Sequence, residues 1–309
     1  MSDLLRETKL SDSHDCPAFS KQPILQKIPN RVAEIGEGIT IRRALPSALR
    51  RTIGAWCFFD HFGPVNLKSS DLKIAPHPHM GLQTFTWTLT GEILHRDSLG
   101  SEQIIRPGEV NLMSAGHGIS HSEESLPDSV LHGVQLWIAL PDAVRNNKPE
   151  FSHYSELPSL EQDGVQITVL AGEFLENLAP AKVYSPLIGL ALHARRNAAT
   201  RLPLNPAFEY GVLVLTGEIQ VEQESLVPGT LLYLGCGREE LSLQVASDSH
   251  IFIIGGEPFK EEILLWWNFV ARSKAEMSEA ADAWEKHERF GEVKGYGDGT
   301  ERLNPPKLA

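Results

Sequence analysis

Hydrophobic residues along most of this chain fall in short runs that turn residues interrupt. From Ile39 onward, runs rich in Ile, Val, Phe, Thr and Trp are broken roughly every eight to twelve residues by Gly, Pro, Asp or Asn. Residues 83–90, 110–114 and 133–140 are clear examples. This pattern predicts an antiparallel sandwich or barrel. Residues 1–35 are polar and lack a period, which predicts an arm laid over the surface.

Breaks in the pattern divide the chain into domains. Pro141-Asp142 ends a first β-rich block over residues 36–142, and a polar, Pro-containing linker follows over 143–164. A second β-rich block covers 165–260, and the segment 261–309 is expected to be helical. With 309 residues, of which 41% are hydrophobic, the chain can support two cores of ordinary size. We therefore expect an all-β protein with two tandem domains and a C-terminal helix.

An internal repeat relates the two blocks. The sequence Thr-Leu-Thr-Gly-Glu-Ile at 88–93 recurs as Val-Leu-Thr-Gly-Glu-Ile at 214–219. A Pro-Gly step followed by a strand-like run begins at Pro107 and again at Pro228. The Gly-Glu element suits a hairpin turn with positive φ, and the Pro-Gly element suits a tight turn that leads into the next strand. The same elements in the same order indicate two similar β-barrels.

The spacing of apolar residues becomes helical after Pro258. Ser273-Lys274-Ala275-Glu276 has the form of a capping box, which satisfies backbone N–H groups at the start of a helix. We predict one amphipathic helix that ends near Phe290-Gly291, and we expect the pair Trp266-Trp267 to pack in the core rather than to contact a ligand. The apolar residues of the predicted helix are Met277, Ala280, Ala281 and Trp284.

Charge and the lack of long apolar runs narrow the function classes. The formal net charge is -12 and the pI is near 5.5. Direct binding to nucleic acid or to an anionic membrane needs clustered Lys and Arg, so we expect neither. No run reaches the roughly 18 apolar residues of a membrane helix, and the N-terminus lacks the apolar core of a signal peptide, which favours a soluble cytoplasmic protein.

The cysteines predict neither a disulfide framework nor a thiolate zinc site. Cys16, Cys57 and Cys236 are far apart and have no Cys-x-x-Cys spacing. In an intracellular protein such residues are expected to be reduced, structural thiols.

Two short motifs contain residues that bind metal ions. His77 and His79 are two residues apart at the start of a predicted strand, so their imidazoles project to the same face. His121 and Glu123 repeat this spacing later in the same block. Three imidazoles and one carboxylate suit Fe(II), Mn(II), Ni(II), Co(II), Cu(II) or Zn(II) rather than Ca²⁺ or Mg²⁺. The alternative is that the His-x-His pair arose by chance on the surface.

The second block serves as an internal control for this site. Placing the Thr-Gly-Glu motifs in register puts Pro203 and Asn205 opposite the His-x-His pair. Placing the Pro-Gly motifs in register puts Ser242 and Gln244 opposite the His-x-Glu pair. All four ligands are then missing together from the second copy. This all-or-none loss favours one metal site in the first barrel over scattered structural histidines.

Several motifs between Ile39 and Phe290 match a known family. They are His77-Pro78-His79, His95-Arg96-Asp97-Ser98, Pro107-Gly108, Ala115-Gly116, Gly118-Ile119, His121-Ser122-Glu123 and Gln135-Leu136-Trp137. In these motifs the chain resembles the pirins, which are bicupins of the cupin superfamily. The resemblance implies two tandem cupin β-barrels of the jelly-roll type. It also implies an iron in the first barrel, held by His77, His79, His121 and Glu123, and no metal in the second.

The resemblance also bears on residues around the ligands. Gln83 stands where many pirins have Glu, so a fifth protein ligand is not expected. His95, Asp97 and Gln135 are expected to form hydrogen bonds around the site rather than to act on a substrate. His117 is expected in an exposed loop, with a position at the mouth of the pocket as the alternative.

The activity that the resemblance implies is that of a metal-dependent dioxygenase. Pirins are similar to quercetinases, which add both atoms of O₂ to a flavonol, so the implied substrates are a planar enol or catechol and O₂. Glu123 could act both as a ligand and as a transient base, and the alternative is that as an anionic ligand it only balances the charge of the ion. Around a six-coordinate ion, four protein ligands leave two adjacent positions for substrate and O₂ or water, whereas a four-coordinate zinc would be closed and structural. We expect one divalent ion, foremost Fe²⁺.

A non-enzymatic regulator is the alternative function. Its iron would sense redox state and its surface would bind a protein partner, as nuclear pirins are thought to do with transcription factors. A purely structural bicupin is disfavoured by the intact ligand set.

Overall fold

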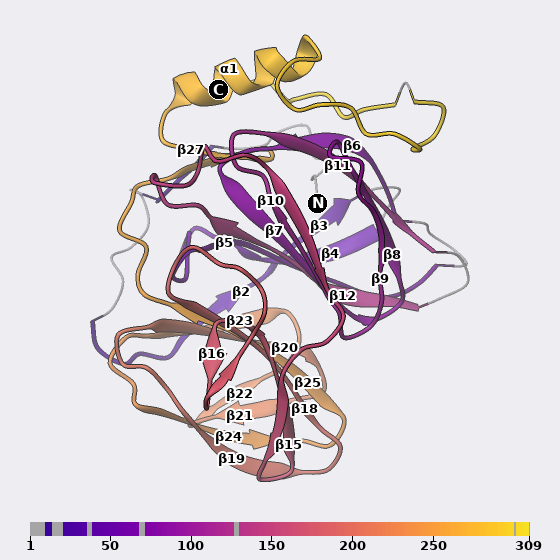
Figure 1. Ribbon diagram of the computed structural model, residues 1–309. Helices are drawn as coiled ribbons and strands as arrows, with labels where there is room; N and C mark the ends of the chain where they lie inside the picture. Colours follow the sequence, from indigo (N-terminus) through magenta and orange to yellow (C-terminus); the bar gives the residue numbers. More distant parts are fainter. Residues whose placement is uncertain are drawn as a thin grey trace.

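The computed structural model describes residues 10–13, 21–35, 39–67, 72–126, 130–299 and 301–308. The described chain is mostly β, with one α-helix, α1 (Lys274–Glu285). Figure 1 shows two β-barrels that lie against each other, with α1 on the far side of the first barrel. The prediction of two tandem barrels with a C-terminal helix is confirmed.

Two antiparallel sheets form the first barrel. The smaller sheet has the strand order β6 (Lys73–His79), β11 (Ile119–Ser125), β8 (Ile93–Asp97) and β9 (Glu102–Ile105). The larger sheet has the order β13 (Glu150–Tyr154), β10 (Val110–Ser114), β7 (Leu82–Thr90), β12 (Val130–Ala139), β5 (Trp56–Asn66), β4 (Ile39–Leu45) and β3 (Arg31–Ile35).

The second barrel repeats this arrangement. Its smaller sheet has the order β19 (Ala198–Pro203), β24 (Glu240–Val245), β21 (Ile219–Val221) and β22 (Glu224–Leu226). Its larger sheet has the order β14 (Ser159–Gln162), β15 (Val165–Ala171), β18 (Leu187–Ala194), β25 (Ser249–Gly256), β20 (Glu209–Thr216), β23 (Thr230–Gly235) and β2 (Gln26–Pro29). Three short pairs lie outside the larger sheets: β1 (Ser11–Asp12) with β26 (Leu264–Trp266), β26 with β27 (Phe269–Ala271), and β16 (Glu173–Phe174) with β17 (Asn177–Leu178).

The repeated glycines occupy equivalent turns. Gly91 and Gly217 have φ values of 80° and 76°, a conformation that glycine adopts without the steric penalty other residues pay. The Gly-Glu turn is not a hairpin, however. Strand β7 belongs to the larger sheet and β8 to the smaller one, so the Gly91 turn carries the chain between sheets. The motif therefore predicted the backbone conformation of this turn correctly, but not which strands pair on either side of it.

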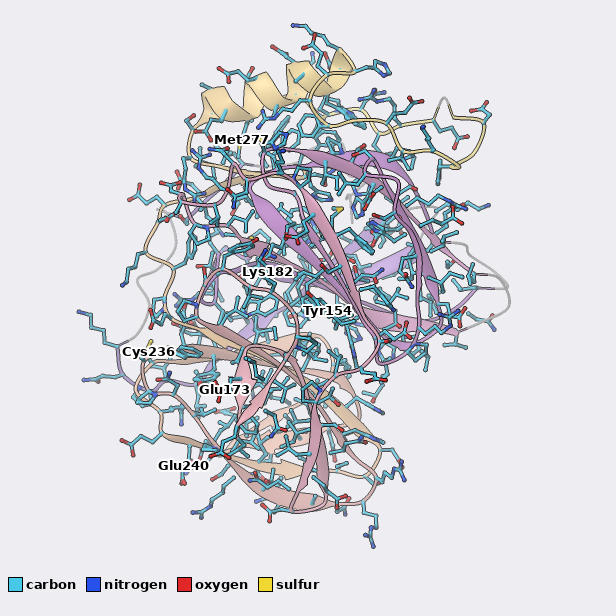
Figure 2. The ribbon with its side chains drawn as sticks, in the orientation of Figure 1. Tyr154, Glu173, Lys182, Cys236, Glu240 and Met277 are labelled. Atoms are coloured by element: carbon cyan, nitrogen blue, oxygen red, sulfur yellow. The ribbon has the colours of Figure 1, made fainter. Side chains whose placement is uncertain are left out.

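Parts of the predicted arm and linker are strands. Within residues 1–35, β2 pairs with β23 of the second barrel, and β3 pairs with β4 of the first. Within residues 143–164, β13 joins the first barrel and β14 joins the second. These strands lie at sheet edges, where pairing with a neighbour stabilises polar segments that have no apolar period. Figure 2 labels Tyr154 and Lys182 between the barrels, where the Lys182 backbone N–H donates to the Tyr154 hydroxyl at 3.4 Å.

The C-terminal helix begins where the capping box predicted. The Ser273 hydroxyl accepts from the backbone N–H of Glu276 at 3.2 Å. The helix ends at Glu285, earlier than the predicted Phe290, because His287 and Arg289 adopt positive φ values of 59° and 68°. Met277 is fully buried on the side of α1 that faces the first barrel (Figure 2).

Apolar packing joins the two barrels. Phe252 of the second barrel contacts Phe59 and Trp87 of the first, with ring centroids 5.5 and 5.8 Å apart. Elsewhere, Trp266, Trp267 and Trp284 are buried, as expected of core residues. No described helix is long and apolar enough to cross a membrane.

Two of the three cysteines lie in the described structure. Cys57 and Cys236 are buried and free, and Cys16 falls outside the described residues. Burial raises the pKa of the Cys57 thiol to about 12 and that of the Cys236 thiol to about 11. Thiols that stay protonated in this way are unreactive, as expected of structural cysteines.

Candidate metal centre

The interior of the first barrel contains a belt of polar residues between two apolar clusters. Along β12, Gln135 separates Leu131 of one apolar cluster from Trp137 of the other. Buried polar groups lower stability unless they find partners, so a belt of them calls for a ligand or a hydrogen-bond network. The buried polar residues of the belt are Asp60, His77, His79, Thr86, His95, Asp97, His121, Glu123 and Gln135.

Three of the four predicted ligands converge within this belt. Strands β6 and β11 are antiparallel neighbours that place His77 directly opposite His121. The ring of His79 contacts that of Trp137, from the opposite sheet, at 5.1 Å between centroids, so this face is the barrel interior. One nitrogen from each imidazole lies within 4.8 Å of the other two, and the three residues are at most 1% exposed. The three nitrogens could together hold one metal ion.

Backbone carbonyls determine which nitrogen of His77 and His79 faces the centre. Nδ1 of His77 lies 2.9 Å from the Ala75 carbonyl oxygen, and Nδ1 of His79 lies 3.1 Å from that of Asn268. A carbonyl oxygen only accepts, so each Nδ1 carries the hydrogen and each Nε2 presents a lone pair. Burial lowers the pKa of His77 to about 3 and that of His79 well below its ordinary value, which keeps both rings neutral.

Glu123 lies in the same interior but outside the group of three nitrogens. A register shift after His121 places Glu123 opposite Ile74 on β6. The residue is 2% exposed. Its Oε2 atom is buried and has no hydrogen-bond partner in the described part of the chain. Coordination by Glu123 therefore stays a prediction.

The unsatisfied atoms of this belt fit a cation. Nε2 of His77 and Oε2 of Glu123 are both acceptors, and neither has a donor among the described residues. Nε2 of His79 lies 3.1 Å from Nε2 of His121. Two nitrogens bound side by side to an octahedral ion at ~2.1 Å would lie about 3.0 Å apart. The donor set and the spacing of these two imidazoles thus suit a divalent metal ion.

His95 and Asp97 form a chain of contacts that leads to His121. Nδ1 of His95 is 3.3 Å from Nδ1 of His121, and Nε2 of His95 is 3.2 Å from Oδ2 of Asp97. Burial opposes ionisation of Asp97, but hydrogen bonds from His95 and Ser101 outweigh it and lower the pKa of the carboxyl group. The His95 ring stacks on Phe151 of β13, with centroids 4.4 Å apart.

Gln135 and Gln83, which the sequence also singled out, form hydrogen bonds with residues outside the histidine group. Gln135 accepts a hydrogen bond from Thr86 at 2.8 Å, within the polar belt. The Gln83 amide nitrogen donates to the Ser114 hydroxyl at 2.8 Å and to the Lys182 carbonyl at 3.0 Å, at the boundary between the barrels.

His117 is a half-buried loop residue rather than an exposed one. Its Nδ1 lies 3.1 Å from the Asn147 carbonyl oxygen, and its own carbonyl accepts from Nε of Arg289 at 2.6 Å. These two contacts join three loops, which explains why the residue is less exposed than expected.

Among the described residues, the second barrel has no group like the three imidazoles, but the four counterparts inferred from the sequence were wrong. Pro203, Asn205 and Gln244 are exposed, and Ser242 is half-buried. Side chains alternate along a strand, so a one-residue difference in a connecting loop exchanges the inner and outer faces. The interior pairs are Leu202 with Leu241 and Thr200 with Leu243.

The two carbonyls that orient His77 and His79 could not be predicted from the sequence. Any residue supplies a carbonyl, so Ala75 and Asn268 carry no pattern that would mark them. Asn268 is also remote in the sequence, in the segment between β26 and β27. The C-terminal segment reaches the strands of the site again where the Ser120 hydroxyl donates to the Phe290 carbonyl at 3.2 Å.

Comparison with known proteins gives family matches in both barrels. The pirin family model matches residues 38–138, and the model of the pirin C-terminal cupin domain matches residues 189–291. The chain is 49% identical over 296 residues to a Pseudomonas aeruginosa protein named "Putative quercetin 2,3-dioxygenase PA1205", a match that covers 95% of this chain and 94% of that protein.

Solved structures give the same result. A crystal structure of quercetin 2,3-dioxygenase from Acinetobacter baumannii shares 49% identity with a TM-score of 0.90, covering 92% of this chain and 96% of that one. Escherichia coli pirin YhhW in complex with nickel(II) shares the fold, with a TM-score of 0.60 at 19% identity, covering 76% of this chain and 100% of that one. The chain belongs to the pirin family, and its two barrels are the two cupin domains of that family.

Proposed function

We propose that this protein is a metal-dependent dioxygenase of the quercetinase type, which acts with O₂ on a planar enol or catechol such as a flavonol. The observation that carries the proposal is the buried group of three imidazoles with two unsatisfied acceptors, Nε2 of His77 and Oε2 of Glu123. The 49% identity to proteins named for quercetin 2,3-dioxygenase activity supports the choice of reaction.

The proposed ligands are His77, His79, His121 and Glu123, and the proposed ion is Fe²⁺. Nickel, which the Escherichia coli pirin carries in its structure, is the first alternative, followed by Mn, Co, Cu and Zn. When bound, a divalent ion would lower the pKa of a substrate hydroxyl and supply Lewis-acid or redox chemistry.

The residues around the ligands would orient the substrate and exclude water. Trp137 and Phe58 stack at 4.0 Å between centroids with planes 12° apart, and the Trp137 ring meets His79 at its edge. Together they offer an apolar wall beside the centre. Glu123 Oε2 is the atom that we propose takes the proton of the substrate hydroxyl, because it is a buried acceptor to which no described residue donates.

The test is turnover by protein reconstituted anaerobically with Fe²⁺. Quercetin and O₂ are added, and loss of flavonol absorbance is followed together with O₂ consumption. We expect turnover by the wild type and none by His79→Ala. The matched control is His287→Ala, which removes an exposed histidine outside the first barrel and should leave the rate unchanged.

Two outcomes would contradict the proposal. Equal rates for the wild type and His79→Ala would show that the reaction does not use this centre. A metal-loaded wild type that consumes no O₂ with flavonols or simple catechols would favour the alternative of a metal-sensing regulator with a protein partner.

A further inference from the structure

His121 differs from the other two histidines of the centre in the group that orients it. His77 and His79 each point Nδ1 at a backbone carbonyl, which can only accept a hydrogen bond. His121 instead points Nδ1 at Nδ1 of His95, 3.3 Å away. An imidazole nitrogen can donate or accept, so this contact alone leaves the protonation of His121 undefined.

Asp97 removes this ambiguity. Its Oδ2 lies 3.2 Å from Nε2 of His95, and a carboxylate can only accept, so His95 carries its hydrogen on Nε2. Nδ1 of His95 then carries a lone pair, which accepts a hydrogen bond from the N–H at Nδ1 of His121. The hydrogen of His121 is thereby held on Nδ1, and its Nε2 presents a lone pair to the centre.

The surroundings of Asp97 and His95 hold both groups in place. Oδ1 of Asp97 accepts from the backbone N–H groups of Leu99 and Ser101 at 2.9 and 3.0 Å, so the carboxylate cannot turn away. The His95 ring lies nearly parallel to that of Phe151, at 13°. Strand β8 pairs with β11 so that His95 is directly opposite Glu123 and Asp97 is opposite His121. His95 therefore lies beside both of the proposed ligands that β11 contributes.

We propose that Asp97 and His95 are positioning residues that fix the tautomer of His121 and so set the metal affinity of the centre. The inference rests on the proposed metal site, but it does not depend on the identity of the substrate. Neither residue needs to touch the substrate or the ion. Partners of this kind typically change metal affinity by about 10- to 100-fold when they are removed.

A purely structural role for the pair makes a different prediction from a positioning role. If Asp97 only stabilised strand β8, its closest isostere, Asn, would be tolerated best. The positioning role instead requires that Asn at this position weaken metal binding more than Ala does. In Asp97→Asn the amide oxygen must stay at the Oδ1 position, where two backbone N–H groups need an acceptor. The amide nitrogen then donates to His95 Nε2 and moves the hydrogen of His95 to Nδ1. Two N–H groups would face each other between His95 and His121.

The first experiment compares metal affinity in three full-length proteins. Metal-free wild type, Asp97→Asn and Asp97→Ala are titrated with Co²⁺ in competition with a chelator, and circular dichroism confirms that each is folded. We expect Asp97→Asn to bind Co²⁺ about 10- to 100-fold more weakly than the wild type. Asp97→Ala should lose less, because His95 can then adopt either tautomer. Affinity in Asp97→Asn equal to or higher than that in Asp97→Ala would overturn the inference.

A second pair of variants separates hydrogen bonding from packing at His95. Gln can accept from His121 through its oxygen and donate to Asp97 through its nitrogen, whereas Phe keeps only the stacking on Phe151. We expect His95→Gln to retain near wild-type affinity and His95→Phe to lose about 10- to 100-fold, with an altered visible spectrum of the bound Co²⁺. The control is His153→Phe, which removes a half-buried histidine hydrogen-bonded to Asn111 and should leave Co²⁺ binding unchanged.

The outcomes distinguish this inference from the proposed function. If the wild type binds no Co²⁺ or Fe²⁺, the metal site fails and the inference fails with it. If the wild type binds metal and His95→Phe binds it equally well, the site stands and the positioning role is overturned. A loss in His95→Phe and in Asp97→Asn that His95→Gln does not share would support the positioning role.

Discussion

The two barrels of this protein share one strand order but have contrasting interiors. Where β6 and β11 pair in the first barrel, His77 lies opposite His121. Where β19 and β24 pair in the second barrel, Leu202 lies opposite Leu241 in a continuous apolar cluster. The second barrel shows that the fold closes and packs around a continuous apolar cluster, with no buried imidazoles at the equivalent strand pair. The polar belt of the first barrel is therefore not required by the fold, and its burial points to a ligand.

The difference between the two interiors should also affect the stability of each barrel. A buried polar atom without a partner costs about 1–3 kcal/mol. The first barrel holds several such atoms among its described residues, including Nε2 of His77, Oε2 of Glu123 and Nε2 of Gln135. A bound cation would satisfy the first two. We expect the first barrel to depend on metal for part of its stability and the second barrel not to.

Removing two of the proposed ligands should have the largest effect on this comparison. In His77→Ala, His121→Ala, metal content measured by elemental analysis should fall from about one ion per chain to none, because too few ligands remain. Metal should also cease to raise the stability of the protein. In the wild type this gain would be about 4 kcal/mol when free metal exceeds its dissociation constant about 1,000-fold.

The measurement is thermal unfolding with and without added metal, together with elemental analysis of freshly purified protein. Unchanged metal content in the double variant would refute the ligand assignment. His287→Ala serves again as a control for the loss of a histidine outside the site.

Cutting a cavity into the second barrel should give the next largest effect. Leu241 is completely buried in the apolar cluster, so Leu241→Ala is expected to destabilise the protein by about 3 kcal/mol in urea unfolding. Its metal content should not change, because the proposed metal centre lies in the other barrel. A parallel loss of metal would mean that the barrels are more tightly coupled than their separate interiors indicate.

This comparison also shows what the sequence could predict. The turn and strand pattern gave two tandem barrels, and Ser273 gave the start of α1. The His-x-His and His-x-Glu spacing gave the three imidazoles that converge. All of these depend on local periodicity or on residues whose chemistry is distinctive, which is why they are visible in one sequence.

The sequence-based predictions failed where the position of a residue or strand depends on the tertiary structure. Matching the repeats through their turns chose Ser242 and Gln244 as counterparts, but the inner face carries Leu241 and Leu243, because a shift of one residue exchanges the faces. The strand β2 pairs with β23, more than half the chain away, and has no periodicity that would mark it. Orienting carbonyls such as that of Asn268 could not be found, since every residue has one.

The boundary between the barrels should make stability depend on pH. His61 and His132 are buried, with their Nε2 atoms 2.7 Å apart. Burial lowers the pKa of His61 to about 3 and that of His132 to about 4, and His250 of the second barrel contributes to the shift of His132. The unfolded chain, with histidine pKa near 6.5, binds protons more readily than the folded one. Stability is therefore full above about pH 6.5 and falls as the pH decreases toward 4 and then 3.

The test is the unfolding temperature between pH 7.5 and pH 4.5 in metal-free protein. We expect it to fall with pH in the wild type and to fall less in His132→Asn, which retains a hydrogen-bonding side chain but cannot titrate. His287→Asn, at an exposed position, should follow the wild type. The same slope in His132→Asn and the wild type would exclude this pair as a source of the pH dependence.

The substitution with the smallest expected effect on stability compares the two barrel interiors most directly. His77→Leu gives the first barrel the residue type that the second barrel has at its interior pair Leu202–Leu241. It removes the unsatisfied Nε2 of His77 and also the hydrogen bond to the Ala75 carbonyl, two changes that nearly offset each other. Metal-free His77→Leu should therefore match the wild type or exceed its stability by about 1 kcal/mol, in urea unfolding.

With metal present, the wild type should be more stable than His77→Leu, because only the wild type gains stability from binding metal. This reversal separates a residue kept for a ligand from one kept for packing. A residue kept for packing would lower stability in both conditions, as Leu241→Ala is expected to do. If metal-free His77→Leu were destabilised by about 3 kcal/mol, as a cavity would be, then the imidazole itself would be part of the core. The polar belt would then need no ligand to explain it.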